Sequence, residues 1–412
     1  MQVLKEKNGK VKVRSQIESE YNGIYYSNIW KLYLFHFFMG CHLISGVLLP
    51  FFLGWGKLTF VEVMILQGYF TIMIFVFEIP CGAISDYLSR KLSLIFSGIV
   101  LAIAALLYGS IPDIIVFFLA ETFFALGVAL NSGTDQAFLH DTLKKIGREE
   151  ELSKFLARTG SFTLLGILIS APIGSLLTLF VPLNYIFTLM FFPFIAASII
   201  ALTLKEPNHD LERESKEKYL SIIKSGFKEL KKNKILRILA IELTIVDALA
   251  FLIIWTYQLY LEELNVPLIF FGLVASAMTL TQIILTNLVP KLEDRFKNKR
   301  LFLILYTLIP GLAYILLAFI LFIPISITLV LIVVGFGISR QIIFFNGINK
   351  QIETENRATV LSTINMISGF TKAIIFPLIG IIVMYNLKIS FIILGITIIL
   401  FALLSQVKNE YL

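Results

Sequence analysis

The chain has 412 residues, of which 57% are apolar and only 15% are charged, whereas globular proteins average about 45–50% apolar and about 25% charged residues. The formal net charge is +7. This composition argues against a large soluble catalytic domain, a nucleic-acid-binding domain or a long disordered segment, and it predicts a protein whose main partner is the lipid bilayer. The two cysteines, Cys41 and Cys81, lie within apolar runs, so we expect neither a disulfide framework nor a metal site.

Residues 1–27 are polar and mixed in charge, which predicts a cytoplasmic amino-terminal tail. The apolar run that follows is too long for the hydrophobic region of a signal peptide, so we expect it to remain as a helix. A spanning helix requires about 20 apolar residues. Twelve segments meet this requirement, over residues 29–53, 61–82, 92–110, 113–137, 159–180, 184–204, 236–261, 268–290, 301–322, 325–347, 359–384 and 388–405.

A long polar stretch separates the first six segments from the last six. We therefore expect an amino-terminal six-helix bundle over 28–204, a cytoplasmic linker over 205–234, a carboxyl-terminal bundle over 235–405 and a cytoplasmic tail over 406–412. Apolar residues at helical spacing between lysines predict an amphipathic helix in the linker, on the inner membrane surface; they are Tyr219, Leu220, Ile223, Phe227 and Leu230. The predicted fold is an all-α membrane protein of two pseudo-symmetric bundles.

The basic residues indicate the orientation of the helices. If both termini are cytoplasmic, Lys57 and Lys388 fall in outer loops and Lys372 falls within a helix, whereas the other Lys and Arg residues lie toward the inner side. Such an excess of basic residues is typical of cytoplasmic loops. We therefore interpret the charge of +7 as a topology signal and expect a multi-pass protein of the cell membrane.

The two halves are related as repeats. A shift of 208 residues aligns residues 82–86 with 290–294 and residues 125–132 with 333–340. Parallel repeats of six helices are one of the known transporter plans, in which the substrate site lies between the halves near the membrane midplane.

The loop between the second and third predicted helices carries the most specific motif. Gly82, Asp86, Arg90 and Lys91 stand in the register of the pattern Gly-x-x-x-Asp-x-x-Gly-Arg-Arg/Lys, with serine in place of the second glycine. The loop resembles the signature of the major facilitator superfamily, and a degenerate copy surrounds Asp294. The resemblance implies a gating and structural role for these five residues, the twelve-helix fold and transport by alternating access.

A second pattern lies in the fifth predicted helix. Residues 166–175 are similar to a Gly- and Pro-rich segment of drug/proton antiporters, although they are one residue short and lack some of its glycines. A kinked helix with small residues for packing explains the same segment about equally well.

Ionisable groups inside the membrane cost about 2.5–3.5 kcal/mol each and therefore indicate function. The resemblance implies that helices one, four, seven and ten line the central cavity, which makes cavity candidates of His36, Glu121, Asp247 and Arg340. His36 alone is more typical of a packed or hydrogen-bonded histidine. Further polar groups within the helices are Gln258, which shares a helix face with Asp247, and Lys372.

Asp247 lies near the middle of its helix. A carboxylate in that setting can bind and release a proton during alternating access. We regard Asp247 as the first candidate for proton coupling and Glu121 as the second. An alternative of similar weight is that Asp247 and Lys372 neutralise one another, because pairing is the usual state of charges inside the membrane.

The sequence therefore predicts a secondary transporter, not an enzyme, that acts as a monomer without a bound cofactor and draws energy from a proton gradient. Four acidic groups within the helices, against two basic ones, favour proton-coupled export of a small lipophilic or cationic compound. Uptake of a small nutrient by the same fold is the main alternative. A non-transporting receptor or scaffold is the alternative from a different class, although no sensory or docking domain is evident.

Overall fold

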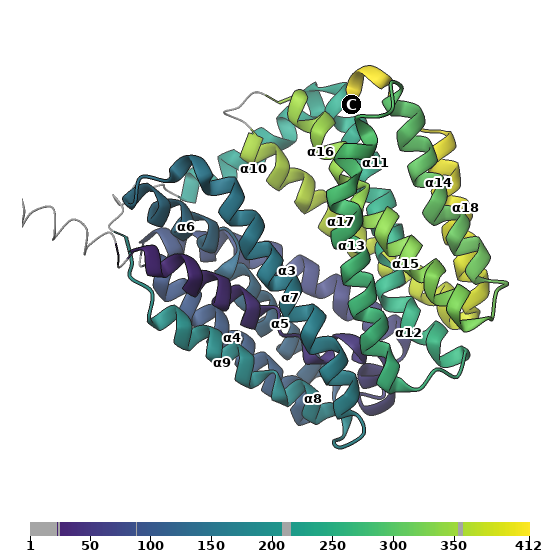
Figure 1. Cartoon of the computed structure of the whole chain (residues 1–412), viewed down its shortest axis with the longest axis horizontal. Helices are drawn as coiled ribbons and strands as arrows, with labels where there is room; N and C mark the ends of the chain where they lie inside the picture. Colours follow the sequence, from purple (N-terminus) through teal and green to yellow (C-terminus); the bar gives the residue numbers. More distant parts are fainter. Residues whose placement is uncertain (1–22, 24, 88, 208–215, 353–356) are drawn as a thin grey trace, which may run out of the picture.

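The computed structural model describes residues 23, 25–87, 89–207, 216–352 and 357–412. Within these residues the chain consists of helices joined by short connections (Figure 1). Ten of the described helices are long and apolar enough to cross a membrane, and the bent pair Tyr25–Gly46 and Leu48–Trp55 forms an eleventh span. The shorter apolar helix Leu387–Leu403 brings the count within the described part to twelve, so the predicted all-α membrane fold is confirmed.

The amino-terminal half contains the first helix (residues 25–39), η1 (Leu43–Gly46), α2 (Leu48–Pro50), η2 (Phe51–Trp55), α3 (Phe60–Tyr87), α4 (Arg90–Ser110), α5 (Ile114–Asn131), α6 (Thr134–Lys145), η3 (Glu149–Glu151), α7 (Leu152–Leu177), α8 (Leu183–Leu189) and α9 (Phe191–Leu202). The linker helix is α10 (Lys216–Lys232). The carboxyl-terminal half contains α11 (Lys234–Phe251), α12 (Ile253–Glu263), η4 (Leu268–Phe270), α13 (Phe271–Glu293), α14 (Lys299–Leu317), α15 (Ile323–Ser339), α16 (Gln341–Lys350), α17 (Arg357–Tyr385), α18 (Leu387–Leu403) and η6 (Asn409–Tyr411).

Side-chain caps mark the first residue of several helices. The side chains of Ser89, Asp113, Asn233, Asn298 and Asn386 accept backbone N–H groups at the amino ends of α4, α5, α11, α14 and α18. Such caps satisfy donors that have no partner inside the helix. Because a cap is encoded within four residues, the predicted starts of these helices lie close to the observed ones.

Breaks interrupt the spans that correspond to predicted helices one, four, seven and ten. The first helix ends before Gly40, α5 and α6 meet at Ser132 and Gly133, α11 and α12 at Leu252, and α15 and α16 at Arg340. Gly133 has φ +73°, a conformation that glycine adopts without strain. The breaks at residues 132 and 340 are aligned by the 208-residue shift of the predicted repeat.

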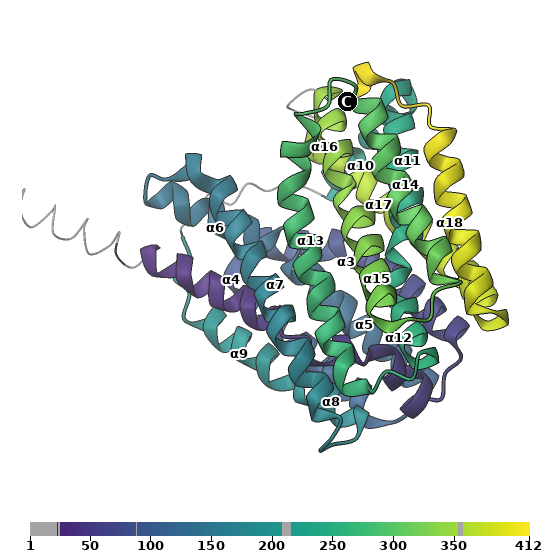
Figure 2. The ribbon, with the colours of Figure 1, turned by 45° about the vertical axis from the view of Figure 1, so that its right-hand side comes forward.

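The two halves pack against each other through α3 with α17 and through α7 with α13. Figures 1 and 2 show that the halves approach at the end that carries α8 and α12 and diverge toward the end that carries α6, α10 and α16. We call these the α8/α12 end and the α6/α16 end.

Small residues allow the backbones to approach where α7 meets its neighbours. A Cβ atom on Gly272 of α13 would lie 2.1 Å from the Ala171 carbonyl oxygen, and one on Gly174 would lie 1.7 Å from the Leu43 carbonyl oxygen. The Ser276 hydroxyl donates to the Leu168 carbonyl oxygen at 2.7 Å. Residues 166–175 therefore serve close packing, as in other membrane helix pairs.

The linker helix α10 packs against the carboxyl-terminal half. A Cβ atom on Gly226 would lie 2.0 Å from the Thr363 hydroxyl of α17, and Leu230 is buried in the core of that half. Phe227, which we predicted on the apolar face of the helix, is 43% exposed. The predicted amphipathic helix therefore exists, but tertiary packing selects Gly226 and Leu230 as its inner face.

The final segment of the chain, predicted as a cytoplasmic tail, is packed against the same half. Val407 and Leu412 are buried, and the Asn409 side chain accepts a hydrogen bond from the Lys299 backbone N–H at 2.7 Å. The segment therefore closes the α6/α16 end of the carboxyl-terminal core.

Candidate functional site

Glu121 is a buried carboxylate in the middle of α5. Its side chain accepts a hydrogen bond from Gln67 of α3 at 2.8 Å and a second one from the Tyr108 hydroxyl of α4. The residue is 3% exposed, and none of the ion pairs found among the described residues includes it. Gln67 and Tyr108 are neutral, so the negative charge of an ionised Glu121 has no counter-charge in contact with it.

A row of polar contacts, which we call the α3/α5 seam, connects α3 with α5. The contacts are Gln67 with Glu121, Tyr69 with Thr122 at 2.7 Å, and Glu78 with Ser132. The first and last pairs are eleven residues apart on both helices, so they lie on the same face and about 16 Å apart along the axis. The seam runs from Glu121 toward the α6/α16 end.

A cavity of about 570 Å³ lies between the halves, at the side of the seam nearer the α6/α16 end. It begins at Thr71, one helical turn from Gln67. Glu78 is the only ionisable group among the described residues that line it. The other lining residues used below are Ser132, Gln136, Ser362, Asn365, Phe75 and Phe370. The cavity therefore combines one acid, several neutral polar groups and aromatic surface.

Asp247 and Lys372 form an ion pair between α11 and α17. The Lys372 ammonium nitrogen lies 2.8 Å from the Asp247 carboxylate and 4.5 Å from the centre of the Phe251 ring. The two side chains are 20% (Lys372) and 16% (Asp247) exposed. This ion pair is the arrangement that we gave as the alternative to a proton-coupling role for Asp247, in which Asp247 and Lys372 neutralise each other.

Gln258 lies at the contact between the halves, at the α8/α12 end. Its side-chain oxygen accepts the Leu49 backbone N–H at 2.8 Å, and its amide donates to the Ser45 carbonyl oxygen at 3.0 Å. Ser45 and Leu49 belong to the irregular second part of the first span, where backbone groups lack helical partners. Gln258 therefore joins α12 to this segment by satisfying its backbone.

Arg340 lies inside the carboxyl-terminal half and is 3% exposed. It donates to the Thr307 hydroxyl at 2.7 Å and to the Glu242 carbonyl oxygen at 3.2 Å, and it stacks over the Phe344 ring. These contacts join α11, α14 and α16 at the break before α16. Arg340, a predicted cavity residue, does not line the cavity of about 570 Å³, because the rotation of its helix directs the side chain into the carboxyl-terminal half.

His36 connects the first helix with α6 and α7. One ring nitrogen lies 3.2 Å from the Asp135 carboxylate, and the other lies 3.3 Å from the Thr163 hydroxyl. The residue is therefore hydrogen-bonded within its own half, in agreement with the interpretation that we preferred for an isolated histidine.

The loop motif of the amino-terminal half joins α4 to α6. Arg90 donates to the Ala137 carbonyl oxygen at 3.0 Å and pairs with Asp141. The Lys91 backbone N–H donates to Glu206, beyond the end of α9, at 3.3 Å. Gly82 lies in the last turns of α3, and the Asp86 side chain lies outside the described part of the chain.

The copy of this loop in the other half uses a different residue from the one predicted. Asp294 is exposed, whereas its neighbour Glu293 is 2% exposed and binds the Lys299 ammonium at 2.8 Å and the Asn346 amide at 3.1 Å. The sequence alignment selected Asp294 because it is an aspartate in register. The last turn of α13 instead directs Glu293 toward α14 and α16.

This difference predicts unequal effects of two adjacent substitutions. We expect Glu293→Ala to destabilise the carboxyl-terminal half by about 1–2 kcal/mol, because the Lys299 ammonium loses its partner but is 30% exposed, so water screens part of the loss. The matched substitution Asp294→Ala should change the stability by less than about 0.5 kcal/mol. Thermal unfolding of both variants in detergent measures the difference, and equal melting temperatures would contradict the assignment.

Gln67 and Tyr108 were not identified from the sequence. Gln67 is the only amide side chain of the second predicted helix, and such a polar residue in a spanning segment is a detectable signal. Its partner is 54 residues away, so only the tertiary structure pairs the two.

Comparisons with known proteins agree with this arrangement. The family model of the Major Facilitator Superfamily matches residues 32–371. A variant of the nucleoside transporter NupG is similar in structure, with a TM-score of 0.79 and 14% identity over 91% of this chain and 98% of that chain. A bacterial homologue of the human lysosomal transporter Spinster, inward-facing and unoccupied, gives a TM-score of 0.71 and 14% identity over 94% and 96% of the two chains.

The peptide transporter POT, in complex with sulfate, gives a TM-score of 0.70 and 12% identity over 91% of this chain and 93% of that chain. No curated protein matches the chain in sequence. At these identities the structural likeness shows the fold alone, whereas the family model covers most of the chain. The protein therefore belongs to the Major Facilitator Superfamily and is a secondary transporter in the membrane, not an enzyme.

Proposed function

We propose that this transporter exports small lipophilic cations in exchange for protons, with Glu121 as the proton-binding group. The observation that carries the proposal is the setting of Glu121, a buried carboxylate with neutral partners. Ionising a buried carboxyl group costs considerable free energy, whereas the protonated form is uncharged and avoids that cost. Its occupancy can therefore change with the exposure of the site to either side of the membrane.

Asp247, our first candidate from the sequence, is less suited to this role. Its carboxylate already has a counter-charge in Lys372 at 2.8 Å, and an opposite charge at that distance favours the ionised form. A proton would have to displace the lysine. We therefore assign Asp247 and Lys372 to the stability of the carboxyl-terminal half.

The cavity supports the substrate class. Glu78 supplies one negative charge, and Phe75 and Phe370 supply aromatic surface on either side of the contact between the halves. A cation is attracted by a carboxylate and by aromatic faces, whereas an anionic substrate would meet only repulsion from Glu78. A volume of about 570 Å³ is within the range of pockets for small molecules.

The direction of transport follows from the proposed orientation. The loops at the α6/α16 end are rich in Lys and Arg, so we assign this end and both termini to the cytoplasm of a cell membrane. The cavity then opens inward, where an exporter takes up its substrate. The likeness to nucleoside and peptide transporters makes uptake of those compounds the alternative for the experiment.

The test uses proteoliposomes that are acidic inside and a panel of tetraphenylphosphonium, ethidium, nucleosides and dipeptides. We expect the wild type to accumulate the cations and Glu121→Gln to accumulate no more than empty vesicles, because the amide cannot bind a proton. The variant should still exchange labelled for unlabelled cation, since exchange requires no net proton movement. Glu263→Gln, which removes an exposed acid of α12, is the control and should behave as the wild type.

Two results would contradict the proposal. Gradient-driven accumulation by Glu121→Gln, together with its loss in Asp247→Asn, would return the proton site to Asp247. Movement of nucleosides or dipeptides, but not of cations, would show uptake of a nutrient instead.

A further inference from the structure

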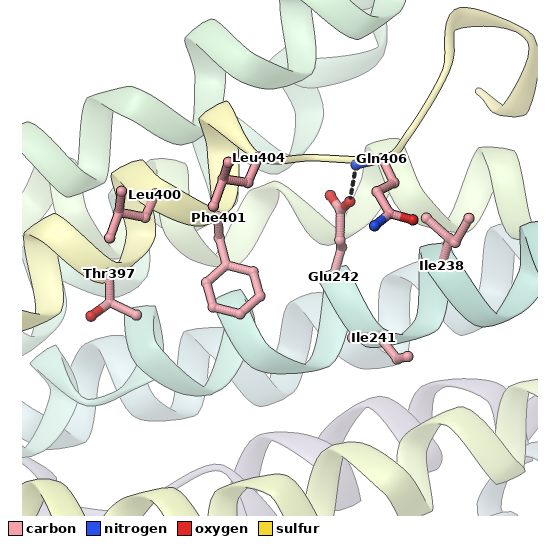
Figure 3. Close-up of a pocket in the computed structure, with 8 residues that line it drawn as sticks. All are labelled: Ile238, Ile241, Glu242, Thr397, Leu400, Phe401, Leu404 and Gln406. Carbon is pink, nitrogen blue, oxygen red and sulfur yellow. Dashed lines mark hydrogen bonds between the residues drawn. The ribbon is translucent and has the colours of Figure 1, made fainter.

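A second cavity lies on the outer surface of the carboxyl-terminal half, between α11 and α18. It has a volume of about 410 Å³ (Figure 3). Figure 1 shows α18 at the edge of this half that is remote from the amino-terminal half, so the cavity is separate from the site described above. Ile241, Leu400 and Leu404 line it and are 46%, 49% and 74% exposed. In a membrane these side chains face lipid, and we call this cavity the α11/α18 groove.

One end of the α11/α18 groove is acidic. The Glu242 side chain is directed toward Gln406 (Figure 3), whose backbone N–H donates to the carboxylate at 2.9 Å. The Ser405 hydroxyl donates to the same carboxylate at 2.8 Å. None of the ion pairs in the described part of the chain includes Glu242; the nearby Arg340 guanidinium donates to the Glu242 backbone oxygen at 3.2 Å. Glu242 is only 7% exposed, so its charge acts in a poorly hydrated setting.

The length of the α11/α18 groove matches part of a lipid acyl chain and its headgroup. Its wall on α18 runs from Thr397 to the end of the helix at Leu403, about 9 Å at 1.5 Å per residue, and continues to Gln406 in the segment that follows. The apolar part of this wall precedes the acidic end, and α18 ends at Leu403, so the acid lies toward the α6/α16 surface of the membrane.

We infer that the α11/α18 groove binds a membrane lipid with a primary ammonium headgroup, such as phosphatidylethanolamine. The acyl chains lie along α18, and the ammonium group donates hydrogen bonds to Glu242. A trimethylammonium headgroup carries the same charge but has no N–H to donate, so the carboxylate discriminates between the two by hydrogen bonding. This inference is independent of the substrate and coupling proposed above.

The test is native mass spectrometry of the delipidated full-length protein, titrated separately with phosphatidylethanolamine and phosphatidylcholine of identical chains. We expect about tenfold tighter binding of the ethanolamine lipid, with N-monomethyl and N,N-dimethyl lipids intermediate, and we expect Glu242→Gln to abolish the preference. Glu262→Gln, an exposed acid of α12, is the control and should retain it. Leu400→Trp, which fills the groove and leaves the acid in place, should weaken the binding of all four lipids.

Equal affinity of the wild type for the ethanolamine and choline lipids would overturn the inference. So would a preference that survives in both Glu242→Gln and Leu400→Trp, because the lipid would then bind elsewhere. Displacement of the bound lipid by tetraphenylphosphonium at its transport concentration would assign the groove to the substrate instead of to the bilayer.

Discussion

Replacing Lys372 with methionine is expected to lower the stability of the carboxyl-terminal half by about 2–3 kcal/mol. The substitution leaves the Asp247 carboxylate without its counter-charge at 2.8 Å. Removing one partner of a fully buried pair costs about 3–5 kcal/mol, and the side chains here are 16–20% exposed, so water screens part of the loss. For a unit of this size the melting temperature should fall by about 5–10 °C. Thermal unfolding in detergent measures the effect.

The matched double variant Asp247→Asn/Lys372→Met separates the two roles of the pair. It has no net charge at the site, so it should be more stable than Lys372→Met alone by about 1 kcal/mol or more. If Glu121 carries the proton, the double variant should also keep proton-coupled transport. A double variant that folds but moves its substrate without protons would show that Asp247 belongs to the coupling machinery.

A methyl group on Gly272 is expected to disturb the contact between the two halves more than the fold of either half. A Cβ atom there would lie 2.1 Å from the Ala171 carbonyl oxygen, across the contact between α13 and α7. Overpacking of this kind costs about 1–3 kcal/mol. Because the two halves are separate bundles, they can relieve the clash by moving apart at the α8/α12 end. We therefore expect Gly272→Ala to shift the population toward states open at that end by about tenfold, which corresponds to about 1.4 kcal/mol.

The measurement is the labelling rate of a cysteine introduced by Ser45→Cys, at the closed contact, in a background where Cys41 and Cys81 are replaced by serine. Gly272→Ala should raise this rate about tenfold while the melting temperature changes little. Gly160→Ala, on α7 with open space around it, is the control and should leave the rate unchanged.

Gly174→Ala introduces a comparable clash within the amino-terminal half and serves as a comparison for Gly272→Ala. Its Cβ atom would lie 1.7 Å from the Leu43 carbonyl oxygen, between two segments of the same bundle. That clash cannot be relieved by moving the halves apart, so this variant should lose thermal stability instead. If Gly272→Ala unfolds as readily as Gly174→Ala and its labelling rate is unchanged, the α13–α7 contact is part of the fold and not a mobile interface.

Local patterns in the sequence were sufficient for the positions of the helices. The predicted segment 92–110 corresponds to α4 at Arg90–Ser110, and 388–405 corresponds to α18 at Leu387–Leu403. Hydropathy and helix capping depend only on residues of the same helix, so both can be recognised in one continuous stretch of sequence. The repeat also aligned residues 132 and 340, where two helices break, because related halves place their irregular backbone at related positions.

The contacts of the site residues could not be predicted from any single helix, because they join side chains of different helices. The sequence alone determined that the protein is a membrane bundle of two related halves, with a few ionisable groups inside the bilayer. Only the tertiary structure decided that Lys372 pairs with Asp247, that Gln67 faces Glu121, and that Glu293 is buried where Asp294 is exposed. The physical reason is that helical periodicity fixes which residues share a face, whereas the rotation of each helix against its neighbours is set by packing across the whole bundle.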